Sequence, residues 1–207
     1  YLRFLGLINK SILYIMKLSE IKIYVINLEK REDRLEQISE MLDGYNWERI
    51  DAVNDVKGYF GCVKSHIKSL EQARDRGLSE VIIMEDDHMF INEQDFKYPE
   101  ECDVCLLTGK NIQGTNINDD FIKITSARHT DCYLVKQHYY DTMIKCFKES
   151  LEKLIESYTL SFYLDIYWDK YMKLDQFICL RRLTGYQREG YSDIQNQRQN
   201  REVKLII

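Results

Sequence analysis

One stretch, Val81-Ile82-Ile83-Met84-Glu85-Asp86-Asp87-His88, constrains the fold of this chain more than any other. Its first four residues are apolar and mostly β-branched, which is typical of a short strand buried on both faces. Three carboxylates follow without a spacer. In an open α/β sheet the ligand crevice lies beyond the carboxyl ends of the parallel strands, so these carboxylates are placed to hold a cation. We therefore predict a metal site for a phosphorylated substrate at the end of this strand.

Strand-like and helix-like segments alternate around this stretch. The alternation predicts an α/β sandwich with a largely parallel central sheet. The segments with strand character are residues 21–27, 47–53, 81–84, 104–108, 131–135 and 177–180. The segments with helical spacing are residues 31–42, 61–76, 137–155 and 162–172, and residues 110–120 have the composition of a polar loop.

Length and charge limit the domain organisation and the partners. The 207 residues suffice for one domain with a sizeable core. We predict an N-terminal extension at residues 1–17, with a frayed helix as its simplest form. A single domain then spans residues 18–207, and its polar end, residues 186–207, is a surface tail or mobile segment. The net charge is −5 and no basic stripe interleaves with aromatic residues, so we expect no nucleic-acid partner.

The cysteines and the apolar segments bear on the compartment. Most of the six cysteines sit in apolar runs, which favours reduced thiols. Cys102 and Cys105 form a C-x-x-C, but no second pair completes a zinc site, so we assign it to packing. We expect no transmembrane segment, because residues 1–17 are too short and too interrupted to span a bilayer. A cytoplasmic protein is the expectation, in the host cytoplasm if the richness in Ile, Lys, Asn and Tyr reflects an AT-rich virus.

The three carboxylates divide into two roles. Glu85 and Asp87 are i and i+2, so on an extended chain they point to the same side and are the predicted metal ligands. Asp86 then faces the other way, to brace the loop or to touch a ribose or sugar hydroxyl. The alternative is an acidic turn that is simply solvated, and the buried strand before it favours the metal site.

Two further segments carry polar side chains at predicted helix starts. Arg31 and Arg34 follow the first strand, where guanidinium and free N–H groups would meet a pyrophosphate, although these residues taken alone are better explained by a charged helix face. Ser65 and His66 lie in the first turns of the next helix. There His66 would hydrogen-bond the substrate or serve as a satisfied core histidine.

Four sequence patterns occur in a fixed order. They are Asn-Leu-x-x-Arg-x-x-Arg at 27–34, Asp-Ala-Val at 51–53, Gly-Cys-x-x-Ser-His at 61–66 and Glu-Asp-Asp at 85–87. This combination resembles the family 25 glycosyltransferases, the group that includes lipooligosaccharide sugar transferases and collagen galactosyltransferase domains. The resemblance covers about the first half of the chain. Residues 131–135, Leu164-Asp165 and residues 190–194 are similar more loosely, and Asp131-Cys132 stands where the family usually has Gly or Ala.

The resemblance implies a GT-A-like domain, a nucleotide-binding αβα sandwich that binds a UDP-sugar. It implies Mn²⁺ or Mg²⁺ on the Glu-Asp-Asp segment, which agrees with Glu85 and Asp87 as ligands. The positions that would contact the donor are Asn27, Leu28, Arg31, Arg34, Ala52, Val53, Ser65, His66, Asp86 and Ser192.

The catalytic base must come from the second half of the chain. A metal on the diphosphate would help the leaving group depart, and an inverting reaction also needs a carboxylate to take the acceptor proton. Asp165 is the first candidate and Asp169 the second. They are i and i+4, so both would face one cleft on a helix, although they fit an ordinary charged face equally well.

The predicted function is therefore an inverting, metal-dependent glycosyltransferase. It would move a hexose or N-acetylhexosamine from a UDP-sugar to a hydroxyl of a glycan or protein. Two alternatives remain: a nucleotide-sugar-binding protein with a vestigial site, and a nucleotidyltransferase, which also places acidic pairs at strand ends.

Overall fold

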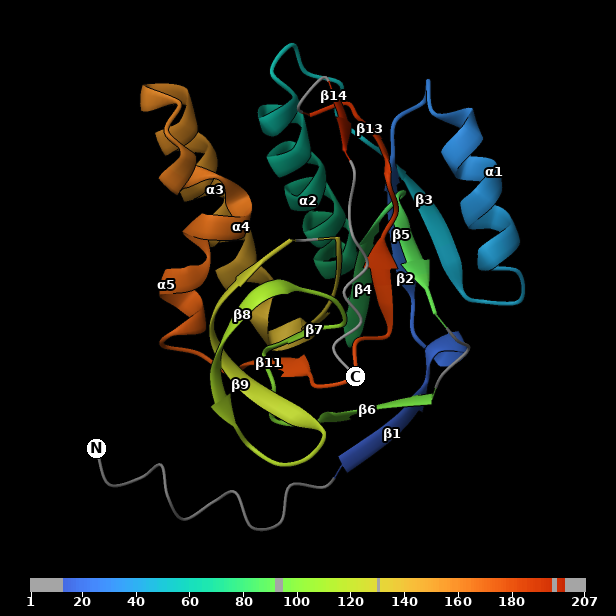
Figure 1. Cartoon of the computed structure of the whole chain (residues 1–207), viewed down its shortest axis with the longest axis vertical. Coiled ribbons are helices and arrows are strands. Elements are labelled where there is room, and N and C mark those ends of the chain that lie inside the picture. Colours follow the sequence, from blue (N-terminus) through green and yellow to red (C-terminus); the bar gives the residue numbers. More distant parts are fainter. Residues whose placement is uncertain (1–12, 92–94, 130, 195–196, 200–207) are drawn as a thin grey trace.

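The computed structural model describes residues 13–91, 95–129, 131–194 and 197–199. It has the predicted α/β architecture, built on one sheet of eight strands (Figure 1). In spatial order these strands are β3 (Trp47–Asp51), β2 (Ile23–Asn27), β4 (Glu80–Glu85), β10 (Cys132–Lys136), β7 (Val104–Leu106), β11 (Phe177–Leu180), β9 (Phe121–Arg128) and β8 (Lys110–Asn116).

The sheet is mixed, with most strands running the same way. Neighbours β3, β2 and β4 are parallel, and so are β7 and β11. The strands β10 and β9 run against their neighbours. The prediction of a largely parallel sheet is therefore confirmed for strand direction, while the two reversed strands make several neighbouring pairs antiparallel.

Helices cover both faces of the sheet. Helices α2 (Gly58–Asp75), α3 (Tyr140–Ser157), α4 (Leu164–Tyr167) and α5 (Asp169–Met172) pack on one face, and α1 (Glu32–Met41) packs on the other. Short 3₁₀ turns lie at Leu18–Glu20, Gln137–Tyr139 and Leu160–Phe162. Within the described part of the chain, none of the helices has the length and apolar character needed to cross a membrane.

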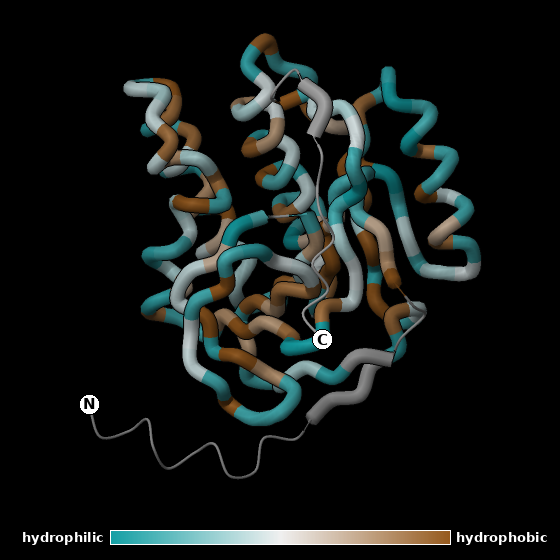
Figure 2. The backbone as a smooth tube through the Cα atoms, in the orientation of Figure 1, coloured by the Kyte–Doolittle hydropathy of each residue, from teal (hydrophilic) through white to brown (hydrophobic). Residues whose placement is uncertain are grey.

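The apolar run at residues 81–84 is buried on both faces. Val81 and Ile83 belong to the core beneath α2 and α3, whereas Ile82 and Met84 belong to the core beneath α1. Successive side chains of a strand point to opposite faces, so a strand between two helical layers needs an unbroken apolar run. Figure 2 shows this hydrophobic character along the central strands.

Helix α2 ends close to the predicted stop. Gly77 has a φ of +65°, the left-handed conformation that glycine adopts readily after a helix. Leu78 and Ser79 then lead directly into β4. The end of this helix therefore fixes where the acidic strand enters the sheet.

Short strand pairs also lie outside the main sheet. They are β1 (Leu13–Lys17) with β6 (Asp95–Pro99), β5 (His88–Phe90) with β12 (Gly185–Gln187), and β13 (Gly190–Ser192) with β14 (Gln197–Gln199). The described part of the predicted N-terminal extension is thus a strand rather than a helix, and residues 1–12 lie outside the described residues. Part of the predicted tail is also paired, because β12 lies against β5.

The predicted loop at residues 110–120 is wrong over most of its length, because Lys110–Asn116 forms strand β8. Its side chains are mostly exposed, since β8 is the last strand at its edge of the sheet. An exposed edge strand needs no apolar alternation and can be charged or polar, so its sequence has the composition of a loop.

Candidate active site

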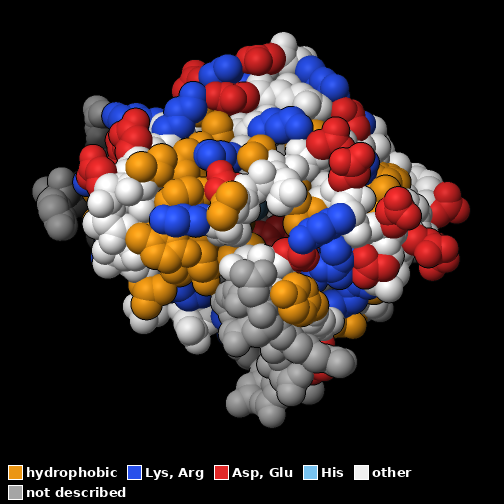
Figure 3. All heavy atoms as spheres, turned by 90° about the horizontal axis from the view of Figure 1, so that it is seen from above, with side chains coloured by type: hydrophobic (Ala, Val, Ile, Leu, Met, Phe, Trp, Pro, Cys, Tyr) orange, Lys and Arg blue, Asp and Glu red, His pale blue; other side chains and the backbone are white. Residues whose placement is uncertain are grey.

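The carboxyl ends of three parallel strands meet at one edge of the sheet. Residue pairing places Asn27 of β2 beside Asp51 of β3, and Ile26 beside Glu85, the last residue of β4. A cavity of about 210 Å³ opens at this edge. Figure 3 looks onto this end of the molecule and shows a central recess with acidic atoms at its base and basic side chains beside it.

Most of the predicted donor and metal residues line this cavity, which we call the donor cavity after that prediction. They are Leu28, Arg34, Ala52, Val53, Ser65, His66, Glu85, Asp86, Asp87 and Ser192. Asn27 and Arg31 are not among the described residues that line it. The structure therefore brings together side chains that are far apart in sequence.

Asp86 is held by two side chains from the first strand and helix. The Arg34 Nη1 lies 2.5 Å from Asp86 Oδ1, and Asn27 Nδ2 donates to Asp86 Oδ2 at 2.8 Å. Burial raises the pKa of Asp86, and the charge of Arg34 opposes that rise. Asn27 is buried and also accepts a hydrogen bond from Arg49. Asn27 and Arg34 thus position the acidic turn.

Arg31 lies outside the described lining of the donor cavity but pairs with Asp193, which belongs to it. Its guanidinium pairs with Asp33 at 3.0 Å and with Asp193 at 2.7 Å, and Lys30 also pairs with Asp193 at 2.7 Å. Arg34 donates to the carbonyl oxygen of Tyr191 at 2.8 Å. These contacts tie the C-terminal segment around Tyr191 and Asp193 to the start of α1, where it forms one wall of the donor cavity.

Glu85 and Asp87 face a common neighbour, although not for the predicted reason. Asp86 and Asp87 form a turn between β4 and β5, so the chain is not extended there. The amide nitrogen of Gln187 donates to Asp87 Oδ1 at 3.0 Å and lies 3.5 Å from Glu85 Oε2. The Gln187 N–H group, which carries a partial positive charge, thus lies between the two carboxylates. Carboxylates supply the hard oxygen ligands that Mn²⁺ and Mg²⁺ prefer, so Glu85 and Asp87 fit such an ion.

Gln187 and Arg188 are site residues that sequence reasoning missed. Gln187 reaches the site because β12 pairs with β5 in the register Gln187 with His88. Arg188 donates from its Nη2 to the carbonyl oxygen of Asp86 at 2.9 Å. Both lie in a polar segment without periodicity, so no local pattern indicates that they fold back onto the acidic turn.

Ser65 and His66 have different environments on α2. Ser65 is buried, accepts a hydrogen bond from the Val53 N–H at 2.8 Å and donates to the Gly61 carbonyl at 2.7 Å. His66 lies between two elements, with Nδ1 2.8 Å from the Tyr133 hydroxyl and Nε2 3.3 Å from Glu85 Oε1. Ser65 therefore holds the β3–α2 connection, whereas His66 contacts the acidic strand end directly.

A second cavity of about 150 Å³ adjoins the first, and we call it the acceptor cavity after the acceptor site that the predicted reaction requires. The residues that line both cavities are Cys62, Glu85, Gln187, Ser192 and Ile194. Asp165, His129 and two tyrosines, Tyr59 and Tyr163, line only the second. The two tyrosine rings are stacked with centroids 3.9 Å apart, which gives this cavity an aromatic wall.

The two candidate bases lie in different surroundings. Asp165 lines the acceptor cavity, and its Oδ2 accepts a hydrogen bond from the backbone N–H of His129 at 3.3 Å. Asp169 is absent from the described lining of both cavities, and its carboxylate binds Arg128 at 2.9 Å and Ser126 at 2.8 Å. The structure therefore separates the two carboxylates that the i, i+4 spacing grouped together.

Similarity to known proteins is found in structure rather than in sequence. No protein-family model and no curated protein sequence matches the chain. Among solved structures, a glycosyltransferase involved in glycosylation of the major capsid of PBCV-1 is similar at 11% identity, over 77% of this chain and 80% of that one, with a TM-score of 0.49.

Two other solved structures are similar at lower TM-scores. The nucleoside-diphosphate-sugar pyrophosphorylase from Vibrio cholerae shares 9% identity over 78% of this chain and 73% of that one, with a TM-score of 0.44. A Drosophila β1,4-galactosyltransferase 7 mutant, in complex with manganese, UDP-Gal and xylobiose, shares 13% identity over 59% and 52%, with a TM-score of 0.37. The structural neighbours thus include glycosyltransferases at low identity, and membership of family 25 stays a prediction.

Proposed function

We propose that this chain is a metal-dependent glycosyltransferase that moves a hexose or N-acetylhexosamine from a UDP-sugar to a hydroxyl of a glycan or protein. One observation carries the proposal: two cavities meet at Glu85, with the acidic turn and Arg34 in one and the Asp165 carboxylate in the other. A transfer reaction needs this pairing of a site for a charged donor with a separate site for the acceptor.

The donor cavity has a charged part and an apolar part. Ile26, Ala52 and Val53 offer apolar contact for a nucleoside, while Arg34 and Lys30 supply positive charge for a diphosphate. Glu85 and Asp87 would hold the divalent ion, which would neutralise charge on the departing diphosphate. Asp86 holds Arg34 in place through their ion pair. A cavity with both an apolar part and a charged part suits a nucleotide sugar, which carries a nucleoside and a diphosphate, better than a purely apolar or a purely charged cavity would.

The acceptor cavity supplies the base. Asp165 lines it while Asp169 is bound by Arg128 and Ser126. We therefore assign to Asp165 the removal of the acceptor proton in an inverting transfer, and to the stacked Tyr59 and Tyr163 the apolar wall beside the acceptor. Asp169 has a structural role through its ion pair.

The test is a screen of UDP-sugars with Mn²⁺ that follows both thermal stabilisation and UDP release. A bound donor raises the melting temperature as it saturates the folded state. We expect Asp165→Asn to lower turnover by about 10²- to 10⁴-fold, the range for loss of a general base, with the donor-induced stabilisation unchanged. Asp87→Ala should remove metal-dependent turnover. Asp169→Asn is the matched control and should keep the turnover of the parent.

Four results would contradict the proposal. Full activity of Asp165→Asn removes Asp165 as the base, and full activity of Asp87→Ala removes the metal assignment. Tight UDP binding without release of UDP from any donor indicates a binding protein. Release of pyrophosphate in place of UDP indicates a nucleotidyltransferase.

A further inference from the structure

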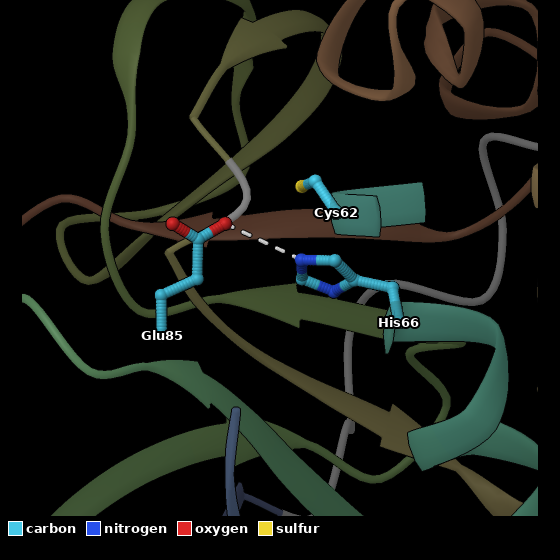
Figure 4. A group of neighbouring side chains, drawn as sticks. All are labelled: Cys62, His66 and Glu85. Atoms are coloured by element: carbon cyan, nitrogen blue, oxygen red, sulfur yellow. Dashed lines mark hydrogen bonds and ion pairs between the residues drawn. The ribbon is translucent and has the colours of Figure 1, made fainter. Parts of the chain in front are cut away.

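Three potential metal ligands from two elements converge between the cavities. Cys62 and His66 are i and i+4 on α2, so they share one face of the helix. Glu85 comes from the end of β4, and one ligand atom of each residue lies within 4.8 Å of the others. Figure 4 shows the Cys62 sulfur and the His66 ring directed towards the Glu85 carboxylate.

The histidine of this cluster is held on its far side. Its Nδ1 lies 2.8 Å from the Tyr133 hydroxyl, and the two rings are nearly parallel, with centroids 5.7 Å apart. Tyr133 is fully buried and packs edge-on against Trp168. When the Tyr133 oxygen accepts the Nδ1 proton, Nε2 presents its lone pair to the cluster. A metal-binding histidine usually has this kind of second hydrogen bond, which fixes the ring and its tautomer.

The donor set differs from that of Glu85 and Asp87. A thiolate, an imidazole and a carboxylate together are the ligands that Zn²⁺ prefers, whereas Mg²⁺ and Mn²⁺ prefer oxygen. Three protein ligands also leave a fourth position of a tetrahedral ion for water or substrate. Cys62 and Glu85 line both cavities, so that position lies where the cavities join.

Glu85 has one oxygen for each set of neighbours. Its Oε1 lies 3.3 Å from His66 Nε2, and its Oε2 lies 3.5 Å from the Gln187 amide that also binds Asp87. We propose that Cys62, His66 and Glu85 form a second cation site, selective for Zn²⁺ over Mg²⁺ and Mn²⁺, which shares only Glu85 with the oxygen pair of Glu85 and Asp87. This site does not depend on the proposed transferase activity.

The experiment uses Co²⁺ as a spectroscopic substitute for Zn²⁺ on the full chain. Titration with Co²⁺ should give a thiolate-to-cobalt charge-transfer band that saturates at one ion per chain and disappears when Zn²⁺ is added. Excess Mg²⁺ should leave the band in place. Cys62→Ser should abolish the band, and Tyr133→Phe should weaken Co²⁺ binding by about 10- to 100-fold, the usual effect of losing a partner of a ligating histidine.

Two controls separate this site from the other candidates. Asp87→Asn should retain the band, because Asp87 belongs to the oxygen pair. Cys102→Ala should also retain it, because Cys102 belongs to the buried C-x-x-C. Circular dichroism checks that each variant is folded, and a Tyr133→Phe chain that binds Co²⁺ as tightly as the parent would contradict the role of Tyr133.

The inference is overturned if the parent shows no charge-transfer band, or if the band survives in folded Cys62→Ser. Its failure differs from that of the proposed function. A chain that binds Co²⁺ through Cys62 but releases no UDP retains the zinc site and loses the transferase assignment. A chain that transfers sugar but shows no band retains the transferase assignment and loses the zinc site.

Discussion

Replacing Arg34 with methionine tests the electrostatics of the acidic turn. The side chains of Arg34 and Asp86 are only 12% and 9% exposed, and the change leaves the Asp86 carboxylate with Asn27 Nδ2 as its remaining side-chain donor among the described residues. Removing one partner of a buried ion pair typically costs about 3–5 kcal/mol of unfolding free energy. Because the pair is partly exposed, we expect a loss of about 3 kcal/mol at pH 7.

The loss of unfolding free energy that Arg34→Met causes by leaving the charge of Asp86 unpaired cannot exceed the cost of protonating Asp86, because a neutral Asp86 no longer needs Arg34. A carboxyl group with the ordinary pKa of 3.8 takes up a proton at pH 7 at a cost of about 4.4 kcal/mol, and at pH 5 at about 1.6 kcal/mol. Burial already raises the pKa of Asp86 above the unfolded value, so its stabilising contribution is full in acid and falls as the pH rises through the folded pKa. Losing Arg34 raises that pKa further. The loss in Arg34→Met should therefore be smaller at pH 5 than at pH 7.

Urea unfolding followed by circular dichroism measures these differences, provided the slope with denaturant stays constant. The double variant Arg34→Met/Asp86→Asn should recover most of the loss. What remains is the lost hydrogen bond to Tyr191, usually about 1 kcal/mol, together with the lost ion pair between Arg34 and Asp87 at 3.4 Å. Arg76→Met, which removes an exposed guanidinium paired with Glu48, is the matched control and should change little. The reasoning is refuted if Arg34→Met loses as much at pH 5 as at pH 7, or if Asp86→Asn restores nothing.

Two further substitutions, one of them with a matched control, test the packing and the buried polar contacts of the site. Gly61→Ala should lower the unfolding free energy by about 1–3 kcal/mol, because a Cβ at this position would overlap the Val53 carbonyl oxygen. Gly190→Ala is the control and should be close to neutral in the same urea titration, because the nearest atom to a Cβ there is 3.9 Å away. Asp131→Ala should cost about 1–3 kcal/mol for each buried partner it leaves unpaired, His88 and Thr108. Burial opposes ionisation of Asp131, but the hydrogen bond and charge of His88 lower its pKa. The difference in unfolding free energy between Asp131→Ala and the parent should therefore shrink as the pH falls through that pKa. A difference that grows in acid would contradict the assignment.

The sequence predicts the elements that have a strong local pattern. Residues 81–84 are buried on both faces, and a strand between two helical layers leaves an unbroken apolar run that can be recognised without a structure. Helices α2 and α3 are likewise expected from their spacing, because one side of each packs on the sheet. The edge strand β8 has no buried face to impose a pattern, so its sequence does not reveal it.

The site is predictable only where its residues follow a patterned element. Glu85 ends a recognisable strand and Asp86 follows it, and their place at the sheet edge follows from the direction of that strand. Gln187 reaches them through pairing of two three-residue strands, which has no local signature. The environments of Asp165 and Asp169 differ because Arg128 and Ser126 of β9 contact only one carboxylate through their side chains, and helical spacing carries no information about such neighbours.

The tie between the start of α1 and the segment around Tyr191 and Asp193 has a consequence for synthesis of the protein. The donor cavity draws its wall from residues as far apart as Ile26 and Ile194, so its last part is synthesised well after the residues of the acidic strand. At about 5–20 residues per second, the roughly one hundred residues after Asp87 take several seconds to make. During that interval Arg34 and Asp86 are already present while Gln187 has yet to be made. The wall that Gln187 and Ile194 supply can therefore join the cavity only after the acidic turn has been synthesised.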